Sequence, residues 1–250
     1  MDETKISKVI AAGCDAAYDD GEEALRLFAE ACSAMTDYYN SAGETAFLKA
    51  NASRRWARRI VDNLCRTIDD TPQSITFSGA YKHDVIKKQL AIYERLLILC
   101  AGTPNIIAKI HYELALLLRD PDDLTPFDDH FRMAVSARPR WSEAYMCWAE
   151  EFESSGSPKE RRHAIEIYEQ ALRQRSLEGG KDARIKILEK LIHRCQKERK
   201  HAEAEKYTAQ LRKLRPIVPV APDLRIRRSA FCPCHSGKKY KDCCGKRESS

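Results

Sequence analysis

Four of the ten cysteines in this 250-residue chain lie within thirteen residues near its C-terminal end. They form two close pairs: Cys232 with Cys234, and Cys243 with Cys244. Zinc accepts four thiolates in a tetrahedral arrangement, and a short polar hairpin with a turn at Ser236 and Gly237 would bring the two pairs together. The residue types and their spacing therefore predict a zinc site.

A disulfide framework is the weaker interpretation of these cysteines. The other six stand singly along the chain: Cys14, Cys32, Cys65, Cys100, Cys147 and Cys195. Nothing at the N-terminus has the composition of a secretory signal, which favours a reducing compartment, so we expect a cytoplasmic protein. A flexible tail that merely contains cysteines is the remaining alternative.

Four protein ligands would leave the zinc ion without an open coordination position. Such a site is structural, because catalytic zinc keeps a place for water or substrate. The segment 225–250 has a formal net charge of +6. Zinc with four thiolates carries about −2, which still leaves a basic surface. We therefore expect an acidic partner, either an acidic protein face or ribosomal RNA or another nucleic acid.

The run Cys-x-Cys-x-Ser-Gly-x5-Cys-Cys resembles the SEC-C motif, the small zinc module at the C-terminus of the translocation ATPase SecA. The resemblance implies Zn²⁺ held by the four clustered cysteines. Lys238, Lys239, Tyr240 and Lys241 match the basic and aromatic stretch of the motif. These four residues and three preceding arginines are the candidate docking residues; the arginines are Arg225, Arg227 and Arg228.

Two positions depart from the family pattern. His235 stands where glycine is usual, and it is either a competing ligand or a solvent-exposed side chain. Cys244 holds the last ligand position, which is histidine in SecA and cysteine or histidine across the family. In SecA the motif engages the export chaperone SecB and lies near the ribosome. The resemblance therefore implies a role in protein targeting, chaperoning or ribosome association.

Three similar units repeat through the second half of the chain, aligned on His111, Tyr145 and Leu188, which are 34 and 43 residues apart. Each unit predicts a helix, a turn, a second helix and a terminal breaker. The pattern resembles the tetratricopeptide (TPR) repeat, although the third unit has Thr208 where an aromatic residue is usual. The resemblance implies an all-α fold, a TPR-like solenoid of helical hairpins with a small C-terminal zinc-binding module.

The repeat pattern also assigns residues to the core. Small residues such as Ala149 and Ala164 let two helices approach closely, and neighbouring units must stack because no single hairpin buries its apolar face. We expect the aromatic residues of the units to be core residues rather than a ligand cage. Cys147 and Cys195 stand at core spacing and are expected to be buried thiols.

Upstream of the repeats, periodicity predicts helices over residues 6–18, 21–39, 46–68 and 84–100, and a loop over 71–83. Three prolines in residues 216–222 predict an extended connection before the zinc module. The expected domains are an N-terminal region of degenerate repeats or a cap, a TPR-like solenoid, a linker and a zinc module: 1–82, 83–215, 216–230 and 231–246.

Charge is unevenly distributed along the chain. Residues 1–50 have a net charge of −6, residues 51–215 of +7 and residues 216–250 of +5. One predicted helix contains four closely spaced arginines, in which Arg54 with Arg58 and Arg55 with Arg59 have i, i+4 spacing. They bind phosphate or pair with the acidic N-terminal helices, and the sequence leaves both interpretations open.

The usual catalytic motifs are missing from the sequence. It contains no HExxH, GxSxG, GxGxxG or Walker-type phosphate-binding loop. The acidic group Asp120, Asp122 and Asp123 surrounds a proline, and turn chemistry explains it without catalysis. We therefore expect a protein that is not an enzyme.

The expected function is that of an adaptor. Its solenoid groove would bind a protein or peptide while its basic zinc tail docks on a second, acidic partner. Helical position alone suggests the groove-facing residues: Lys109, Glu113, Glu143, Met146, Lys186, Lys190 and Arg194. Two alternatives stay open. The tail binds nucleic acid through its arginines and lysines, or it folds back and caps the last helix pair.

Overall fold

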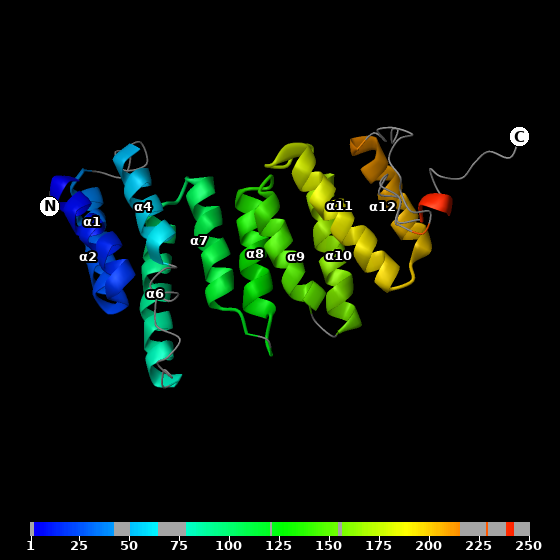
Figure 1. Cartoon of the computed structure of the whole chain (residues 1–250). Coiled ribbons are helices and arrows are strands. Elements are labelled where there is room, and N and C mark those ends of the chain that lie inside the picture. The colour runs from blue at the N-terminus through cyan, green and yellow to red at the C-terminus, as the bar shows by residue number, and fades with distance from the viewer. Residues whose placement is uncertain are drawn as a thin grey trace, which may run out of the picture. The chain divides into compact units, whose positions relative to one another are not determined.

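The computed structural model describes residues 3–42, 51–64, 79–120, 122–154, 157–215, 229 and 239–242. Within these ranges all regular elements are helical (Figure 1). They are α1 (Glu3–Asp19), α2 (Gly21–Ala42), α4 (Asn51–Leu64), α6 (Gly79–Leu99), α7 (Pro104–Leu117), α8 (Thr125–Ala137), α9 (Ser142–Ser154), α10 (Pro158–Arg173), α11 (Gly180–Lys197), α12 (His201–Leu214) and the 3₁₀ helix η1 (Tyr240–Asp242).

The helices predicted from periodicity are present, although their ends differ from the predicted ones by a few residues. Residues 6–18 and 21–39 lie within α1 and α2. The helix predicted over 46–68 corresponds to α4, and the ends of that range lie outside the described residues. The predicted loop over 71–83 is wrong for residues 79–83, which form the first turn of α6. A terminal turn needs no apolar period, and Ala80 and Lys82 have favourable helix propensities.

Proline marks the start of three helices of the repeat region. Pro104 opens α7, Pro126 is the second residue of α8, and Pro158 opens α10. The first turn of a helix tolerates proline because its N–H groups have no partner inside the helix, and the fixed φ angle already suits helical backbone. These prolines set the starts of the helices that the repeat pattern predicts.

The chain divides into two compact units, residues 1–148 and 149–250, and the division falls within α9. In unit 1, helices α1, α2, α4, α6 and α7 share one apolar core. The largest side chains of that core include Phe28, Ile60 and Leu96, each fully buried. This division does not test the predicted domain boundaries, which stay predictions.

Close approach between α1 and α2 depends on one glycine. A Cβ atom added at Gly13 would lie 2.7 Å from Cε1 and 2.9 Å from Cδ1 of Phe28. The Phe28 ring is fully buried, so it has no room to move away. The backbone of α1 therefore rests directly on the α2 ring, an arrangement that only a residue without a side chain allows.

The first repeat unit folds as the predicted hairpin of α7 and α8. Phe127, Phe131 and Ala134 are buried in it, and the ring of Phe131 stacks on Trp148 of α9 with centroids 6.3 Å apart. The indole Nε1 of Trp148 also donates a hydrogen bond to Oδ1 of Asp128, at 2.8 Å. The aromatic residues are core residues, as predicted.

Unit 2 contains the C-terminal end of α9 and helices α10, α11 and α12. Helices α11 and α12 pack as a pair, and α10 packs on α11. Thr208, predicted at an aromatic position, instead bonds its hydroxyl to the carbonyl of Ala204. The preceding Tyr207 is the buried aromatic residue, and its hydroxyl donates to Glu169 Oε1 at 2.6 Å.

The two thiols that were predicted to be buried differ in how far they are buried. Cys195 is buried, as predicted. Cys147 is only half-buried, and its sulfur shares a hydrogen bond of 3.2 Å with the hydroxyl of Tyr112. This contact gives the thiol a polar partner, so its position does not need to be fully apolar.

Candidate functional site

The C-terminal motif lies almost wholly outside the described residues. The predicted zinc ligands lie outside them: Cys232, Cys234, Cys243 and Cys244. The same holds for the turn residues, for His235 and Lys238, and for the docking arginines: Ser236, Gly237, Arg225, Arg227 and Arg228. The backbone of Lys241 is described, but its side chain is not. Lys239 is exposed and Tyr240 half-buried, and the N–H of Asp242 donates to the carbonyl of Lys239 at 2.9 Å to close η1.

A polar groove of about 860 Å³ lies in unit 2, between the end of α9, the start of α10 and the C-terminal half of α11. Its walls carry both signs of charge, and two of the predicted groove residues, Lys190 and Arg194, line it. Lys190 Nζ lies 2.9 Å from Glu150 Oε1. Arg161 Nε lies 3.7 Å from Glu198 Oε1, and this second ion pair also lines the groove. The groove is thus lined by ion pairs that a charged partner can compete for.

Arg194 has a structural position in this groove. Its Nη2 atom donates to the backbone carbonyl of Glu153 at 2.6 Å and lies 3.3 Å from Glu153 Oε1. Both side chains are mostly buried, with 12% and 13% of their surface exposed. The hydroxyl of Tyr168 donates to the other carboxylate oxygen of Glu153, at 3.2 Å. Arg194 therefore joins α11 to α9, and a contact of this side chain with a partner stays a prediction.

The remaining groove candidates lie in different surroundings. Lys109 Nζ is 2.6 Å from Glu113 Oε1, and Glu113 is buried, so this pair on α7 is held within the fold. Glu143 is exposed and Met146 half-buried on α9. Lys186 is exposed on α11, one turn before Lys190. The structure does not test whether any of these residues contacts a partner, and their roles stay predictions.

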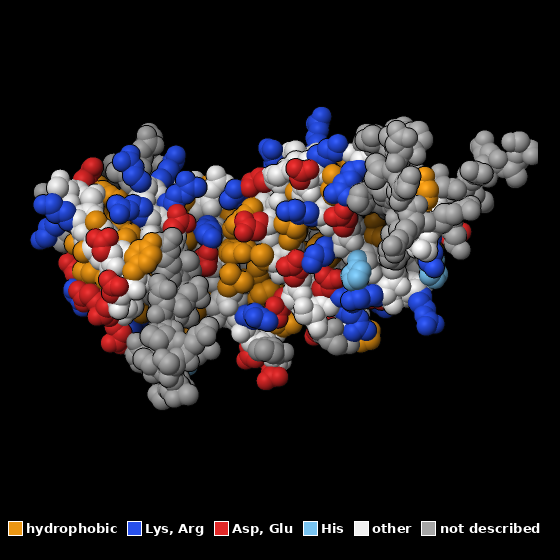
Figure 2. Space-filling model, viewed as in Figure 1, with side chains coloured by type: hydrophobic (Ala, Val, Ile, Leu, Met, Phe, Trp, Pro, Cys, Tyr) orange, Lys and Arg blue, Asp and Glu red, His pale blue; other side chains and the backbone are white. Residues whose placement is uncertain are grey.

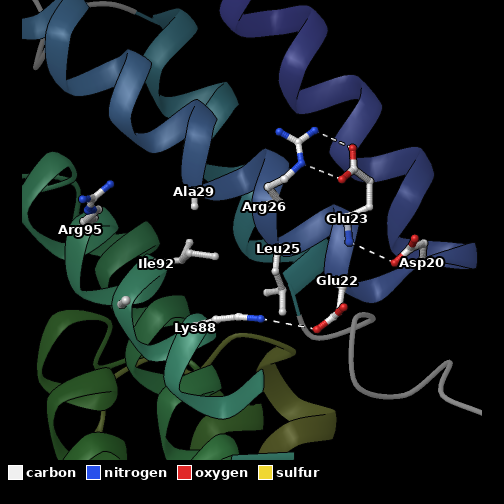
Figure 3. A pocket seen from close by; sticks show the side chains of 10 residues that line it. Asp20, Glu22, Glu23, Leu25, Arg26, Ala29, Lys88, Ile92 and Arg95 are labelled. Carbon is white, nitrogen blue, oxygen red and sulfur yellow. Dashed lines mark hydrogen bonds and ion pairs between the residues drawn. The ribbon is translucent and has the colours of Figure 1, made fainter. Parts of the chain in front are cut away.

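A second hollow, of about 640 Å³, lies in unit 1 between α2 and α6, and no sequence pattern pointed to it. Figure 3 shows the apolar side chains of Leu25 and Ile92 among the residues that line it, near the ion pair of Lys88 and Glu22. The Lys88 Nζ atom lies 3.5 Å from Glu22 Oε1. Arg26 binds Glu23 at 2.6 Å, and this hydrogen bond lowers the pKa of the Glu23 carboxyl. Charges at the hollow thus mostly neutralise one another.

Sequence analysis missed a pair of histidines. His111 on α7 and His130 on α8 lie with their Nδ1 atoms 3.0 Å apart and their rings stacked, centroids 5.2 Å apart. Burial lowers the pKa of both rings, and the neighbouring His130 lowers that of His111 further. No spacing along one helix could reveal the pair, because it forms between two helices of a hairpin.

The acidic group near Pro121 has the local role predicted for it. Asp120 Oδ1 accepts a hydrogen bond from the N–H of Asp122 at 2.9 Å. Asp123 Oδ1 accepts one from the N–H of Thr125 at 3.0 Å, and this bond lowers the Asp123 pKa. These carboxylates shape the turn into α8. Throughout the described ranges, no group of three or more His, Cys, Asp or Glu side chains is placed to hold a metal ion.

The comparison with protein families identifies the tail. Residues 228–246 match the SEC-C motif. The match includes the four clustered cysteines and follows a region of paired helices, so the recognition made from the sequence is confirmed. No curated protein matches the chain. The helices of the described ranges include none that is long and apolar enough to cross a membrane.

Among solved structures, the chain is similar to the crystal structure of a de novo designed helical repeat protein. The two share 15% sequence identity over 85% of this chain and 94% of the designed chain, with a TM-score of 0.35. At that TM-score the similarity adds nothing to what the helix contacts show.

The donor chemistry of the SEC-C segment fits zinc. Its four cysteines offer four thiolates, the soft donor set of structural zinc sites. The buried cysteines of unit 1 are chemically different. Burial raises the pKa of Cys32 to about 12 and that of Cys100 to about 11, which keeps both as neutral thiols near pH 7. A metal ion that needs thiolates would therefore prefer the tail.

Proposed function

We propose that this protein is a non-enzymatic adaptor, which binds one protein through its paired helices and a second, acidic partner through its SEC-C segment. The SEC-C match beside a body of packed helix pairs carries the proposal. Arrays of helix pairs offer extended binding surfaces. The proposed setting is cytoplasmic protein targeting, with a SecB-like chaperone or the ribosome as partner.

Zinc has a structural role in this proposal. Four ligands would hold the ion: Cys232, Cys234, Cys243 and Cys244. The ion supplies the folding free energy that so short a segment lacks, since metal binding and folding are coupled in small zinc modules. The chain's own basic residues around the site, such as Lys239 and Arg228, would meet the acidic partner.

The groove of unit 2 is the proposed protein-binding surface of the body. Lys186 is exposed, and Lys190 forms a partly exposed ion pair with Glu150, so both are accessible to an acidic side chain of a partner. Exchange of a surface ion pair costs little, because such pairs contribute about 0–1 kcal/mol. Arg194 belongs to the fold and is not a partner contact in this proposal.

Affinity purification tests the two surfaces separately. We would compare the wild type, a chain truncated after Pro216, and the double variant Lys186→Glu with Lys190→Glu, each followed by mass spectrometry. Truncation should remove one set of partners and the double variant another. If truncation leaves the partner list unchanged, the SEC-C segment is a cap or an accessory contact. If the double variant binds the same proteins as wild type, the groove is not the binding surface.

A further inference from the structure

The four arginines of α4 lie on the exposed face of a strongly amphipathic helix. Its other side is apolar and buried: Trp56, Ala57, Ile60, Val61 and Leu64 are each at most 4% exposed. The arginines are all exposed. Figure 2 shows Lys and Arg side chains gathered over α4. Residues four apart lie one above the other, about 6 Å along the helix axis, so the arginines make two adjacent rows.

In the described part of the chain, the acidic helices beside α4 do not neutralise three of these arginines, Arg55, Arg58 and Arg59. Helix α4 packs on α1 and α2, and the indole of Trp56 donates to Ser7 Oγ of α1 at 2.9 Å. The carboxylates of α2 nevertheless pair elsewhere, Glu22 with Lys88, and both Glu23 and Glu30 with Arg26. In the part of the chain that the structure describes, no carboxylate forms an ion pair with Arg55, Arg58 or Arg59.

We propose that Arg55, Arg58 and Arg59 of α4 bind the phosphate backbone of single-stranded RNA. A guanidinium group binds phosphate through two parallel hydrogen bonds and keeps its charge at any physiological pH. The rows offer no apolar or aromatic side chain, whereas protein interfaces are anchored by such residues at their centre. Binding of phosphates needs only spaced cations.

A single strand fits the size of the surface better than a duplex. The stretch from Arg55 to Arg59 rises only about 6 Å along the axis. Three guanidinium groups so close together can each reach a phosphate only if the strand bends over them, which a flexible single strand does and a stiff duplex does not. The surface therefore accommodates about three phosphates of a flexible strand, and it reads no sequence. This binding is independent of the adaptor function proposed above, and the SEC-C segment is not part of the surface.

The test uses the full-length, zinc-loaded protein and a fluorescent single-stranded RNA whose anisotropy reports binding across a salt series. The variant replaces Arg55, Arg58 and Arg59 with Gln. Loss of three phosphate contacts should lower the slope of log K against log salt by about 2, and weaken binding at 0.1 M salt about 10- to 100-fold. A second variant with three Lys replacements keeps the charge and should keep most of the slope.

A matched control removes the same charge elsewhere. Lys181, Arg212 and Lys213 are exposed in unit 2, and their replacement by Gln should leave RNA binding within about twofold of wild type. Melting temperatures check that each variant folds. If the triple Gln variant is destabilised, Arg58→Gln alone should change the slope by about 0.7.

Four outcomes would overturn the proposal. The first is that the α4 variant binds RNA with unchanged affinity and slope. The second is that the unit 2 control loses as much binding as the α4 variant. The third is that polyglutamate binds the wild type more tightly than the RNA does and loses its affinity for the α4 variant, which would assign the surface to an acidic protein. Tighter binding of duplex DNA than of RNA would equally reject a single strand as the ligand.

Discussion

Two largely buried polar side chains of this protein, Gln89 and Arg194, bond to partners on neighbouring helices. Gln89 of α6 donates to the carbonyl of Leu64 at the end of α4, at 3.0 Å, and both residues are buried. Arg194 binds Glu153 in the same way in unit 2. A buried polar group costs free energy unless it is hydrogen-bonded, so each pair fixes how two helices pack. Such residues are poor guides to binding surfaces even where they are charged.

Replacement of Arg194 by Met should destabilise unit 2 strongly. The Glu153 carboxylate would keep only the Tyr168 hydroxyl as a partner in a mostly buried position. We expect a loss of about 2–4 kcal/mol in the free energy of unfolding, measured by urea denaturation. Lys186→Met is the control, because this lysine is exposed and should change stability by less than about 0.5 kcal/mol. Equal stability of the two variants would mean that the Arg194 pair contributes nothing.

The paired histidines predict a dependence of stability on pH. The pKa values of His111 and His130 are lowered in the folded protein, while the unfolded chain titrates near 6.5. Below that value the unfolded chain binds more protons than the folded one. Stability should therefore be complete above about pH 6.5 and decrease as the pH falls below it.

Urea denaturation between pH 7.5 and 5.5 measures this effect. His130→Gln should flatten the dependence, since one of the two suppressed titrations is gone and His111 loses a neighbouring ring that would become charged. His201→Gln replaces an exposed histidine and should leave the dependence unchanged. The explanation fails if the wild type and His130→Gln lose stability in parallel on acidification.

Helices of this protein approach one another at distances set by their smallest residues. Gly13 rests on Phe28 where α1 meets α2. Ala115, Ala134, Ala149 and Ala164 are all nearly or fully buried in the repeat region. Small side chains at these positions leave room for the aromatic residues beside them, and dense packing makes each position sensitive to one added methyl group.

Gly13→Ala should destabilise the protein even though alanine is the better helix former. Propensity alone would favour Ala by about 1 kcal/mol. The new methyl group would overlap the buried Phe28 ring, at a cost of about 1–3 kcal/mol that outweighs this gain. Gly13→Ala should cost less stability when it is introduced into the Phe28→Leu variant than when it is introduced into the wild type, because the smaller leucine side chain leaves room for the methyl group. Thermal melting followed by far-UV circular dichroism measures all three variants, and a raised melting temperature for Gly13→Ala would contradict the packing argument.

The molecule combines parts that are stabilised in different ways. The two helical units bury large apolar side chains, whereas the SEC-C segment is short and contains four clustered cysteines. Charge follows a similar division, since residues 1–50 are acidic and residues 216–250 basic. Because their sources of stability differ, the helical units and the tail should respond differently to removal of metal.

Chelation of zinc should unfold the tail and leave the helices intact. We expect less than about a tenth of the far-UV helical signal to be lost, because zinc contributes folding free energy only to the module that it binds. Cys243→Ser with Cys244→Ser should behave like the chelated wild type. A large loss of helical signal would mean that the metal site is integrated into the helical body.

Alkylation mapped by mass spectrometry provides the control for the metal ligands. Four cysteines should become reactive only after chelation: Cys232, Cys234, Cys243 and Cys244. Cys32 and Cys100 should remain unmodified in both states, because they are buried and their raised pKa values keep them as thiols. Reactivity of the four clustered cysteines before chelation would exclude them as zinc ligands.

Local patterns in the sequence were sufficient to predict the helices and the SEC-C motif. Hydrophobic period and proline positions depend on residues close together in the chain, so the hairpin of α7 and α8 and the buried Trp148 followed from them. The cysteine spacing likewise predicted the motif that residues 228–246 match. The first turn of α6 was missed because a helix end carries little periodic signal.

Contacts between helices could not be predicted in this way. The sequence left open whether the arginines of α4 pair with the acidic helices, and it gave no sign that His111 and His130 meet. It placed Arg194 among the groove residues but gave no sign that this side chain is bound to Glu153. Each of these outcomes depends on the rotation and spacing of packed helices. Those are set by side-chain volumes across the whole core rather than by any stretch of neighbouring residues.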